Sequence, residues 1–329
     1  MAAFGIPSIS PELEATIAAG LKDVESILAK RIEGKYLFAN ETSKHLVVAG
    51  GKRFRPLITI LGSMVGSGIN EKVLKAAAVC ELTHLATLYH DDVMDEAPLR
   101  RGVESANSRW GNSVAILTGD YLFAKMSQIL AELGPEAVKL QADTFERLVI
   151  GQIKETQGPS TNEDHLEHYL QVVADKTGSL IATSLKFGAM FAGCSKEEVE
   201  TLTEFGEKIG VAFQLADDII DIASDSLDSG KTPGTDLREG IPTLVTLNAL
   251  KSDDPKDSSL KLALSGPIKS EEKVQWVIEE LRGHKAMAQS RAQLQSVAKE
   301  ARAALGPLPI SDTSSALYSL CDLVIDRVG

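Results

Sequence analysis

The stretch ELTHLATLYHDDVMDEAPLRRG, residues 81–102, joins an apolar helical segment to three aspartates and then to two arginines. At about 100° per residue, Asp91 and Asp95 lie on one face of a helix about one turn apart, with Asp92 to the side. Carboxylates at this spacing repel each other, and the apolar residues before them predict partial burial, which strengthens the repulsion. Mg²⁺ would offset this repulsion, because it takes oxygen ligands and is commonly shared with substrate phosphates. For a single cluster, an acidic helix end in solvent is the alternative.

The same D-D-x-x-D spacing returns in FQLADDIIDIASD, residues 213–225, where Asp217, Asp218 and Asp221 again follow an apolar helical run. Two unrelated solvated helix ends are not expected to share one pattern. Two facing carboxylate walls would hold several divalent ions with a diphosphate between them, and the ions would make that diphosphate a better leaving group. Because the clusters lie far apart in the chain, we expect separate helices of one large domain to carry them.

A basic segment, GGKRFRP at residues 50–56, stands out in a chain whose formal net charge is -12. Its glycines allow close approach to the backbone, and its three cations within four residues indicate an anion site. Taken alone, the segment would be interpreted as an ordinary basic loop. A second basic pair, Arg100 and Arg101, follows the first aspartate cluster. The sequence therefore predicts two diphosphates, one bound through metal and one bound directly by lysine and arginine.

Further polar positions are candidates for contact with phosphate. His84 lies seven residues before the first aspartate, on nearly the same helix face, so its imidazole could donate a hydrogen bond to the directly bound diphosphate. A structural histidine is the alternative. Gln214 lies on the helix face beside the second cluster. Lys176-Thr177 and Lys231 are cationic segments that could reach phosphate from a helix start and a flexible loop, and each alone would be interpreted as solvated.

The rest of the chain is predicted to be helical nearly throughout, which gives an all-α fold and one large domain over residues 1–329. We expect a flexible N-terminus at residues 1–10, followed by a helix that starts at Ser10, Pro11 and Glu12. Apolar residues at helical spacing predict further helices at residues 71–90, 113–133, 136–157, 176–193, 196–224, 270–304 and 312–327. Residues 224–242 and 251–259 are typical of polar loops.

Composition and charge exclude several classes of protein. The acidic net charge disfavours nucleic acid as a partner. We expect no signal peptide, because the N-terminus lacks a basic start followed by an apolar run, and no stretch is long and apolar enough to span a membrane. Cys80, Cys194 and Cys321 are widely spaced in apolar stretches, which is typical of reduced thiols in a cytoplasmic protein.

The motifs together resemble one family. GGKRFRP, the 81–102 segment, GDYLFAK at 119–125, FQLADDIID and GKTPGTDLREGIPTL at 230–244 occur in the order found in the all-trans polyprenyl diphosphate synthases, the trans-prenyltransferases. The resemblance runs from about Gly50 to Leu244, and the helical C-terminus is compatible with it. One departure is Thr232, where the family often has proline, and it leaves the charge unchanged.

The resemblance implies the all-α helical bundle of the isoprenoid synthases, usually a homodimer, and a prenyl-transferring enzyme of the EC 2.5.1 class. Its substrates would be isopentenyl diphosphate and an allylic diphosphate. By motif match, isopentenyl diphosphate would be bound by Lys52, Arg55, His84 and Arg101. The allylic diphosphate would be contacted by Arg100, Lys176, Thr177, Gln214 and Lys231. Mg²⁺ would be carried by Asp91, Asp95, Asp217 and, less directly, Asp221, with catalysis resting on both clusters, Asp91, Asp92, Asp95, Asp217, Asp218 and Asp221.

Two other functions compete with this interpretation. A terpene cyclase shares the fold and the first aspartate motif, but it ionises a single diphosphate and needs no second basic site. A non-catalytic subunit of a two-component synthase tends to lose catalytic motifs, whereas none is lost here. Turnover by the purified chain alone separates the second alternative from an enzyme.

Helix geometry also bears on product length. In short-chain synthases of this family, a bulky aromatic residue one turn before the first aspartate closes the hydrophobic tunnel, and here that turn is Ala86-Thr87. Below it come Thr83 and other small side chains down to Ala76, a path of about 22 Å at 1.5 Å per residue. This predicts a product longer than geranylgeranyl diphosphate. The alternative is that Phe123 or Met126 blocks the tunnel from a neighbouring helix.

Overall fold

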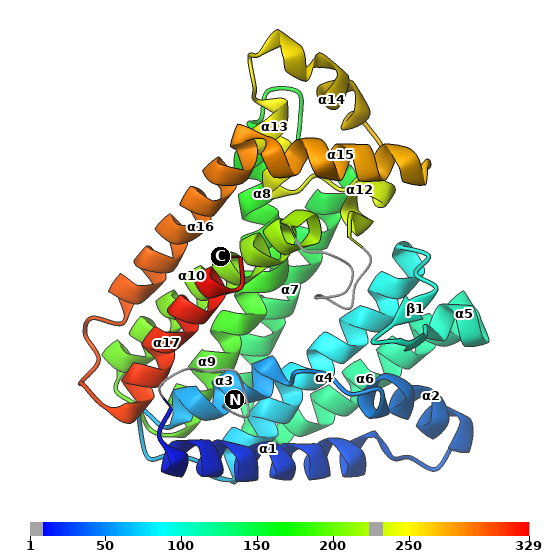
Figure 1. Ribbon diagram of the computed structural model, residues 1–329. Helices are drawn as coiled ribbons and strands as arrows, with labels where there is room; N and C mark the ends of the chain where they lie inside the picture. The colour runs from blue at the N-terminus through cyan, green and yellow to red at the C-terminus, as the bar shows by residue number, and fades with distance from the viewer. Residues whose placement is uncertain (1–8, 224–232, 329) are drawn as a thin grey trace.

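The computed structural model describes residues 9–223 and 233–328, and most of these residues are in helices (Figure 1). The all-α prediction is confirmed. The first helix, α1 (Pro11–Ile32), begins as predicted, because the Ser10 hydroxyl accepts a hydrogen bond from the Leu13 amide at 3.2 Å. The expectation of a flexible N-terminus falls mainly on residues 1–8, which lie outside the described residues.

Helix α4 (Glu71–Met94) runs through the middle of the bundle and carries the first aspartate cluster at its C-terminal end. The Asn70 side chain caps its start by accepting from the Lys72 and Val73 amides. The neighbours of helix α4 include α1, α3 (Phe54–Ser63), α5 (Ala106–Trp110), α6 (Asn112–Leu133) and α9 (Ser179–Phe191). It is longer than the predicted 71–90, because the aspartates continue the helix instead of ending it.

Helix α9 joins α3 to α10 (Lys196–Ala223), which carries the second cluster, and small residues set the separation of all three helices. A Cβ added to Gly188 of α9 would lie 2.0 Å from the Thr59 carbonyl oxygen of α3, and one added to Gly206 of α10 would lie 2.5 Å from the Ala182 Cα of α9. Backbones this close leave no room for a larger side chain. Helix α4 packs against both α3 and α9, so the two aspartate-bearing helices belong to one packed set of helices.

One predicted helix start is wrong. The sequence predicts a helix over residues 176–193 that starts at Lys176. In the structure no helix starts there, because α8 (His165–Val173) continues into a π-helical turn, η1 (Ala174–Gly178), and then into α9 without a break. Lys176 and Thr177 lie inside the π turn. Such turns insert an extra residue and re-aim the side chains beside them. Helix α7 (Pro135–Gln157) packs along the π turn.

The C-terminal part differs from the prediction in three places. The segments predicted to be polar loops, residues 224–242 and 251–259, contain the short helices α12 (Thr235–Glu239) and η2 (Pro255–Asp257). The predicted helix 270–304 is two helices, α15 (Glu271–Gly283) and α16 (Lys285–Ala304), separated at His284, which has extended backbone and caps α16. Helix α17 (Asp312–Asp326) then lies alongside α10 (Figure 1). The remaining elements are α2 (Leu37–Val48), α13 (Leu244–Leu250), α14 (Ser258–Ala263), β1 (Leu99–Arg100) and β2 (Val103–Glu104).

The core is one connected set of buried apolar side chains that extends from Leu13 of α1 to Val328 at the end of the chain. The three cysteines are unpaired, with Cys80 and Cys321 buried in this core. Within the described residues, no helix combines the length and apolar character that a membrane crossing requires.

Candidate active site

The first aspartate cluster occupies the last turn of α4. Asp92 is fully buried and accepts a hydrogen bond from Arg100 Nε at 2.6 Å, and among the described residues its other carboxylate oxygen has no hydrogen-bond partner. Asp91 is half-buried, and Asp95 caps the helix. Burial raises the pKa of Asp91 to about 6, the positive charge of Lys176 lowers it, and the neighbouring Asp95 raises it further. Burial also raises the pKa of Asp92 and of Asp95.

The second cluster lies in the last two turns of α10, and its middle aspartate is the most heavily bonded. Asp218 is buried and accepts hydrogen bonds from the Tyr169 hydroxyl, the Leu244 amide at 3.0 Å and Gln214 Nε2 at 3.1 Å. Burial raises the pKa of Asp218 to about 6, and these donors act in the opposite direction. Asp217 accepts from Arg327 Nη2 at 2.6 Å.

The two clusters share a division of roles. In each, the middle aspartate is buried and accepts hydrogen bonds from the protein. The outer pair, Asp91 with Asp95 and Asp217 with Asp221, is spaced four residues apart and so shares one helix face. In the second cluster the outer pair also has protein partners, the Arg327 guanidinium and the Thr235 amide. Asp92 and Asp218 therefore act as structural carboxylates that connect each cluster to neighbouring segments.

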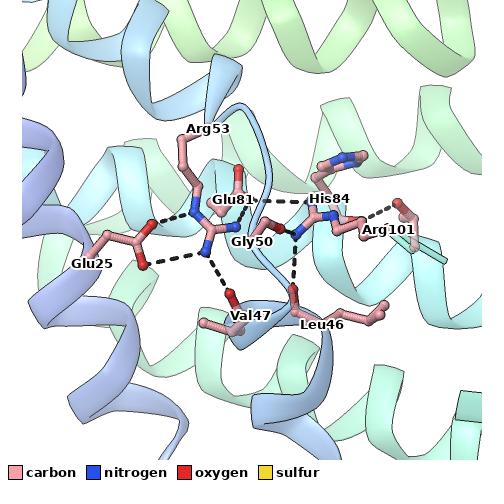
Figure 2. Close-up of polar contacts among 9 residues, drawn as sticks. Glu25, Leu46, Val47, Gly50, Arg53, Glu81, His84 and Arg101 are labelled. Atoms are coloured by element: carbon pink, nitrogen blue, oxygen red, sulfur yellow. Dashed lines mark hydrogen bonds and ion pairs between the residues drawn. The ribbon is translucent and has the colours of Figure 1, made fainter. Parts of the chain in front are cut away.

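The basic segment at residues 50–56 joins α2 to α3 through a strained turn. Arg53 has a left-handed backbone (φ 47°) and donates hydrogen bonds to Glu25, to Glu81 and to the Val47 carbonyl oxygen (Figure 2). A left-handed backbone is unusual outside glycine and persists only where surrounding contacts hold it. Arg53 is thus a structural residue of this segment, and Lys52 beside it is exposed.

A short hairpin brings the second basic pair to the same place. Strands β1 and β2 pair Arg100 with Val103, and the two residues between them, Arg101 and Gly102, both have positive φ (55° and 77°), as tight two-residue hairpins require. Arg101 Nη1 donates to the Leu46 carbonyl oxygen at 3.0 Å and to the Gly50 carbonyl oxygen. The structure therefore brings Arg101 onto the segment that carries Lys52 and Arg55.

Two of the residues predicted to bind isopentenyl diphosphate are perturbed by burial here: His84 of α4 and Arg55 of the basic segment. Burial, reinforced by Arg55 and Arg101, lowers the pKa of His84 well below its usual value, so its imidazole is neutral at pH 7. Burial also lowers the pKa of Arg55, whose Nε is buried and has no hydrogen-bond partner among the described residues. A buried donor of this kind is costly unless a ligand satisfies it. Figure 2 shows His84 beside Arg101.

The π turn η1 carries Lys176 and Thr177, two of the residues predicted to contact the allylic diphosphate. Lys176 Nζ forms an ion pair with Glu155 at 2.6 Å, and its charge lowers the pKa of both Asp91 and Asp95, so it lies within electrostatic reach of the first cluster. Thr177 Oγ1 lies 3.4 Å from Gln214 Oε1, next to the second cluster. The structure thus brings Lys176, Thr177 and Gln214 together between the clusters. Lys231 lies outside the described residues.

Three residues at this site were not singled out from the sequence. Glu81 lies within the ELTH stretch, Tyr169 is 49 positions from Asp218, and Arg327 is the third residue from the C-terminus. The Arg327 guanidinium also covers the Phe213 ring at 4.5 Å from its centroid. Their contacts join segments distant in the chain, and no local pattern marks them.

The carboxylates fit a hard divalent cation. Burial at the end of α4 raises the pKa values of Asp91, Asp92 and Asp95, so keeping these carboxylates charged there is costly and a bound cation would lower that cost. Among the described residues, no three acidic, histidine or cysteine side chains converge on one point. Mg²⁺ does not require such a cage, because it keeps several waters and is usually held by one or two carboxylates together with substrate phosphate.

Comparison with known proteins shows to which family this chain belongs. The profile of the polyprenyl synthetases matches residues 38–281. The chain belongs to the polyprenyl synthetase family. A nonaprenyl diphosphate synthase of Mycobacterium tuberculosis is 47% identical over 316 residues, which cover 96% of this chain and 94% of that protein. A heptaprenyl diphosphate synthase component 2 of Geobacillus stearothermophilus is 35% identical and covers 91% of this chain and 93% of its own length.

A solved polyprenyl synthetase has the same fold. The geranylgeranyl pyrophosphate synthase of Corynebacterium glutamicum, crystallised with calcium and isoprenyl diphosphate, superposes with a TM-score of 0.87 at 44% identity. The match covers 97% of this chain and 98% of that one. The isoprenoid synthase fold predicted from the motifs is therefore confirmed.

Burial of Asp91 predicts that this residue destabilises the folded chain as the pH rises, the opposite of a carboxylate whose pKa is lowered by folding. Its pKa is about 6 when folded, against a usual 3.8, so the folded chain binds this proton more tightly than the unfolded chain. The stability that it contributes is therefore present below about pH 4 and is lost as the pH rises through about 6. Without divalent metal, we expect Asp91→Asn to match the wild type at about pH 4 and to exceed its free energy of unfolding by about 1 kcal/mol at about pH 8.

Urea unfolding with a chelator present measures this difference. Asp143→Asn, a change at an exposed aspartate of α7, is the control and should be neutral at both pH values. If Asp91→Asn were equally destabilised at both pH values, the carboxylate would have a structural role like that of Asp92.

Proposed function

We propose that this chain is a Mg²⁺-dependent, cytoplasmic trans-prenyltransferase that condenses isopentenyl diphosphate with an allylic diphosphate. The observation that carries the proposal is the pairing of two D-D-x-x-D helix ends with two basic segments beside the first of them. The unpaired cysteines support a reducing compartment. The family and its named relatives support the chemistry.

The basic side receives isopentenyl diphosphate. Lys52, Arg55 and Arg101 supply positive charge, and His84, which is neutral, donates a hydrogen bond without adding charge. The unsatisfied Nε of buried Arg55 supports this assignment, because a diphosphate oxygen would complete its bonding. Several contacts of this kind bind a diphosphate without metal.

The acidic side receives the allylic diphosphate. Asp91 and Asp95 on one wall, with Asp217 and Asp221 on the other, would hold divalent cations, and the charge of these cations would make the diphosphate a better leaving group. The direct contacts come from Arg100, Lys176, Thr177, Gln214 and, from outside the described residues, Lys231. The calcium and isoprenyl diphosphate present in the related solved structure support this kind of site.

The reaction follows from these charges. The carbon–oxygen bond of the allylic diphosphate breaks, and the bonding electron pair leaves with inorganic diphosphate. The double bond of isopentenyl diphosphate donates its electron pair to the allylic cation and forms a carbon–carbon bond. The resulting cation loses a proton to the released diphosphate, since the motifs offer no protein base. Lysine and arginine side chains stabilise the negative charge that develops, and apolar walls keep water from the cation.

One assay tests the proposal against both alternatives. The purified chain is incubated with Mg²⁺, isopentenyl diphosphate and an allylic primer, and product mass is read. We expect chain elongation, and we expect Asp217→Ala to lower turnover at least 100-fold because it removes a metal carboxylate. Asp143→Ala is the control and should retain full turnover. Cyclised product would favour a terpene cyclase, and no product without an added partner would favour a component of a two-subunit synthase.

We further propose a product longer than geranylgeranyl diphosphate. Ala86 and Thr87 of α4 are small, and the named nonaprenyl relative supports a long product. One contact weighs against the path to Ala76: Thr83 Oγ1 lies 3.0 Å from both Met126 Sδ and Gln141 Nε2, about 12 Å below Asp91. A methionine side chain is flexible enough to move aside for a growing chain. Phe123 packs against the His90 and Phe145 rings.

Thr87→Phe should shorten the product sharply, because an aromatic ring one turn before Asp91 would close the path before Thr83 is reached. Turnover should persist, since the diphosphate contacts are unchanged. Thr87→Val, of nearly equal volume, should leave the product unchanged. Mass spectrometry of the products decides. A wild type that already stops at farnesyl or geranylgeranyl diphosphate would contradict the proposal and make Met126 and Gln141 the floor.

We also propose a homodimer joined through the adjacent helices α6 and α7. They expose the apolar side chains Ile116, Leu117, Val149, Ile150 and Ile153. Such side chains gathered on neighbouring helices are typical of a protein interface. Sedimentation equilibrium at micromolar concentration should give twice the 35.2 kDa chain mass. Leu117→Asp should weaken the dimer, whereas Leu262→Asp, on distant α14, should not. A wild-type monomer would refute the proposal.

A further inference from the structure

Glu81 is a buried carboxylate beside the predicted isopentenyl diphosphate site. It lies on α4 with 2% of its surface exposed, three residues before His84. A carboxylate this deeply buried persists only where cations or hydrogen-bond donors surround it. Figure 2 shows it between two arginines, Arg53 and Arg101, that come from different loops.

Arg53 is the first of these partners, and its contacts leave little capacity for a substrate. Its Nη1 donates to Glu81 Oε1 at 2.8 Å, its Nη2 donates to the Val47 carbonyl oxygen at 2.9 Å, and its guanidinium also forms a two-pronged contact with Glu25 of α1. Two carboxylates thus neutralise this arginine. Its role is to connect α1, the end of α2 and α4 around the basic segment.

Arg101 is the second partner, and it meets the same carboxylate oxygen. Its Nη2 lies 3.8 Å from Glu81 Oε1, while its Nη1 donates to the carbonyl oxygens of Leu46 and Gly50. The backbone of Gly51 closes one face, because a Cβ there would lie 2.9 Å from the guanidinium carbon. Backbone and Glu81 together determine the direction in which the remaining donors of Arg101 point.

We propose that Glu81 is a positioning residue for the isopentenyl diphosphate site: through one carboxylate oxygen it aligns Arg101 with the segment that Arg53 holds in place. The proposal rests on the proposed function. It assigns Glu81 no contact with substrate. It also gives Arg53 a structural task distinct from the substrate-binding task of its neighbours Lys52 and Arg55.

Two physical effects of removing Glu81 have opposite signs, which makes the proposal testable. Replacing the carboxylate with an amide makes the site more positive, so electrostatics alone predicts tighter binding of a diphosphate. Loss of alignment predicts weaker binding, because the donors of Arg101 no longer point to fixed positions. Glu25→Gln changes the charge on the Arg53 network by the same amount without touching Arg101, and is therefore the matched control.

The experiment measures the Michaelis constants of Glu81→Gln and Glu25→Gln for each substrate in turn, with the other at saturation. We expect Glu81→Gln to raise the constant for isopentenyl diphosphate about tenfold and that for the allylic primer less than about twofold. We expect Glu25→Gln to change either constant less than about threefold. An unchanged or lower constant for isopentenyl diphosphate in Glu81→Gln, or an equal rise in Glu25→Gln, would overturn the proposal.

A second variant covers the case in which Glu81→Gln does not fold. Glu81→Asp keeps the charge and draws the carboxylate back by one methylene, so it should also raise the constant for isopentenyl diphosphate. An unchanged value in a folded Glu81→Asp, with thermal unfolding measured beside it, would likewise overturn the proposal. Failure of the proposed function is a separate outcome, because the wild type would then show no turnover of isopentenyl diphosphate at all.

Discussion

Repulsion among aspartates at the C-terminal ends of two helices is the constraint on which the rest of this structure depends. The C-terminal end of a helix carries partial negative charge, so α4 and α10 each add to the repulsion within their own cluster. Burial adds a second cost, because it disfavours the charged carboxylates and raises the pKa values of Asp91 and Asp218 to about 6. Cations must come to these ends, whether Arg100, Lys176 and Arg327 from the protein or divalent metal.

The middle aspartate of each cluster stabilises the fold, because it binds groups from neighbouring segments. Asp92 binds Arg100 of the β hairpin, and Asp218 accepts from Tyr169 of α8 and from the first amide of α13. The middle aspartate of each acidic motif therefore connects its helix end to neighbouring segments of the chain. Tight contacts at Gly188 and Gly206 keep α3, α9 and α10 in register. Because α4 packs against α3 and α9, both clusters are carried by one packed set of helices.

Local backbone strain is found next to the charged segments. Arg53, Glu96 and Arg101 are the non-glycine residues with positive φ in the described part of the chain, and all three lie in the basic segment or just after the first cluster. Such conformations persist only where neighbouring contacts over-determine them. For Arg53 and Arg101 those contacts include the shared oxygen of Glu81. At the predicted isopentenyl diphosphate site, the ion pairs with buried Glu81 thus help to hold two arginines in unfavourable backbone conformations.

The sequence by itself determined the helical fold, the two carboxylate walls and the basic segments, because helical periodicity and short charged motifs are local properties. It did not determine the π turn that holds Lys176, the break at His284, or the roles of Glu81, Tyr169 and Arg327. These depend on contacts between segments far apart in the chain. Only the tertiary structure decides how the arginines of one motif differ. Arg53 is neutralised by Glu25 and the buried Glu81, whereas Arg55 keeps a donor that no partner satisfies among the described residues. The difference arises because nearby residues of the motif meet different neighbours when the helices pack.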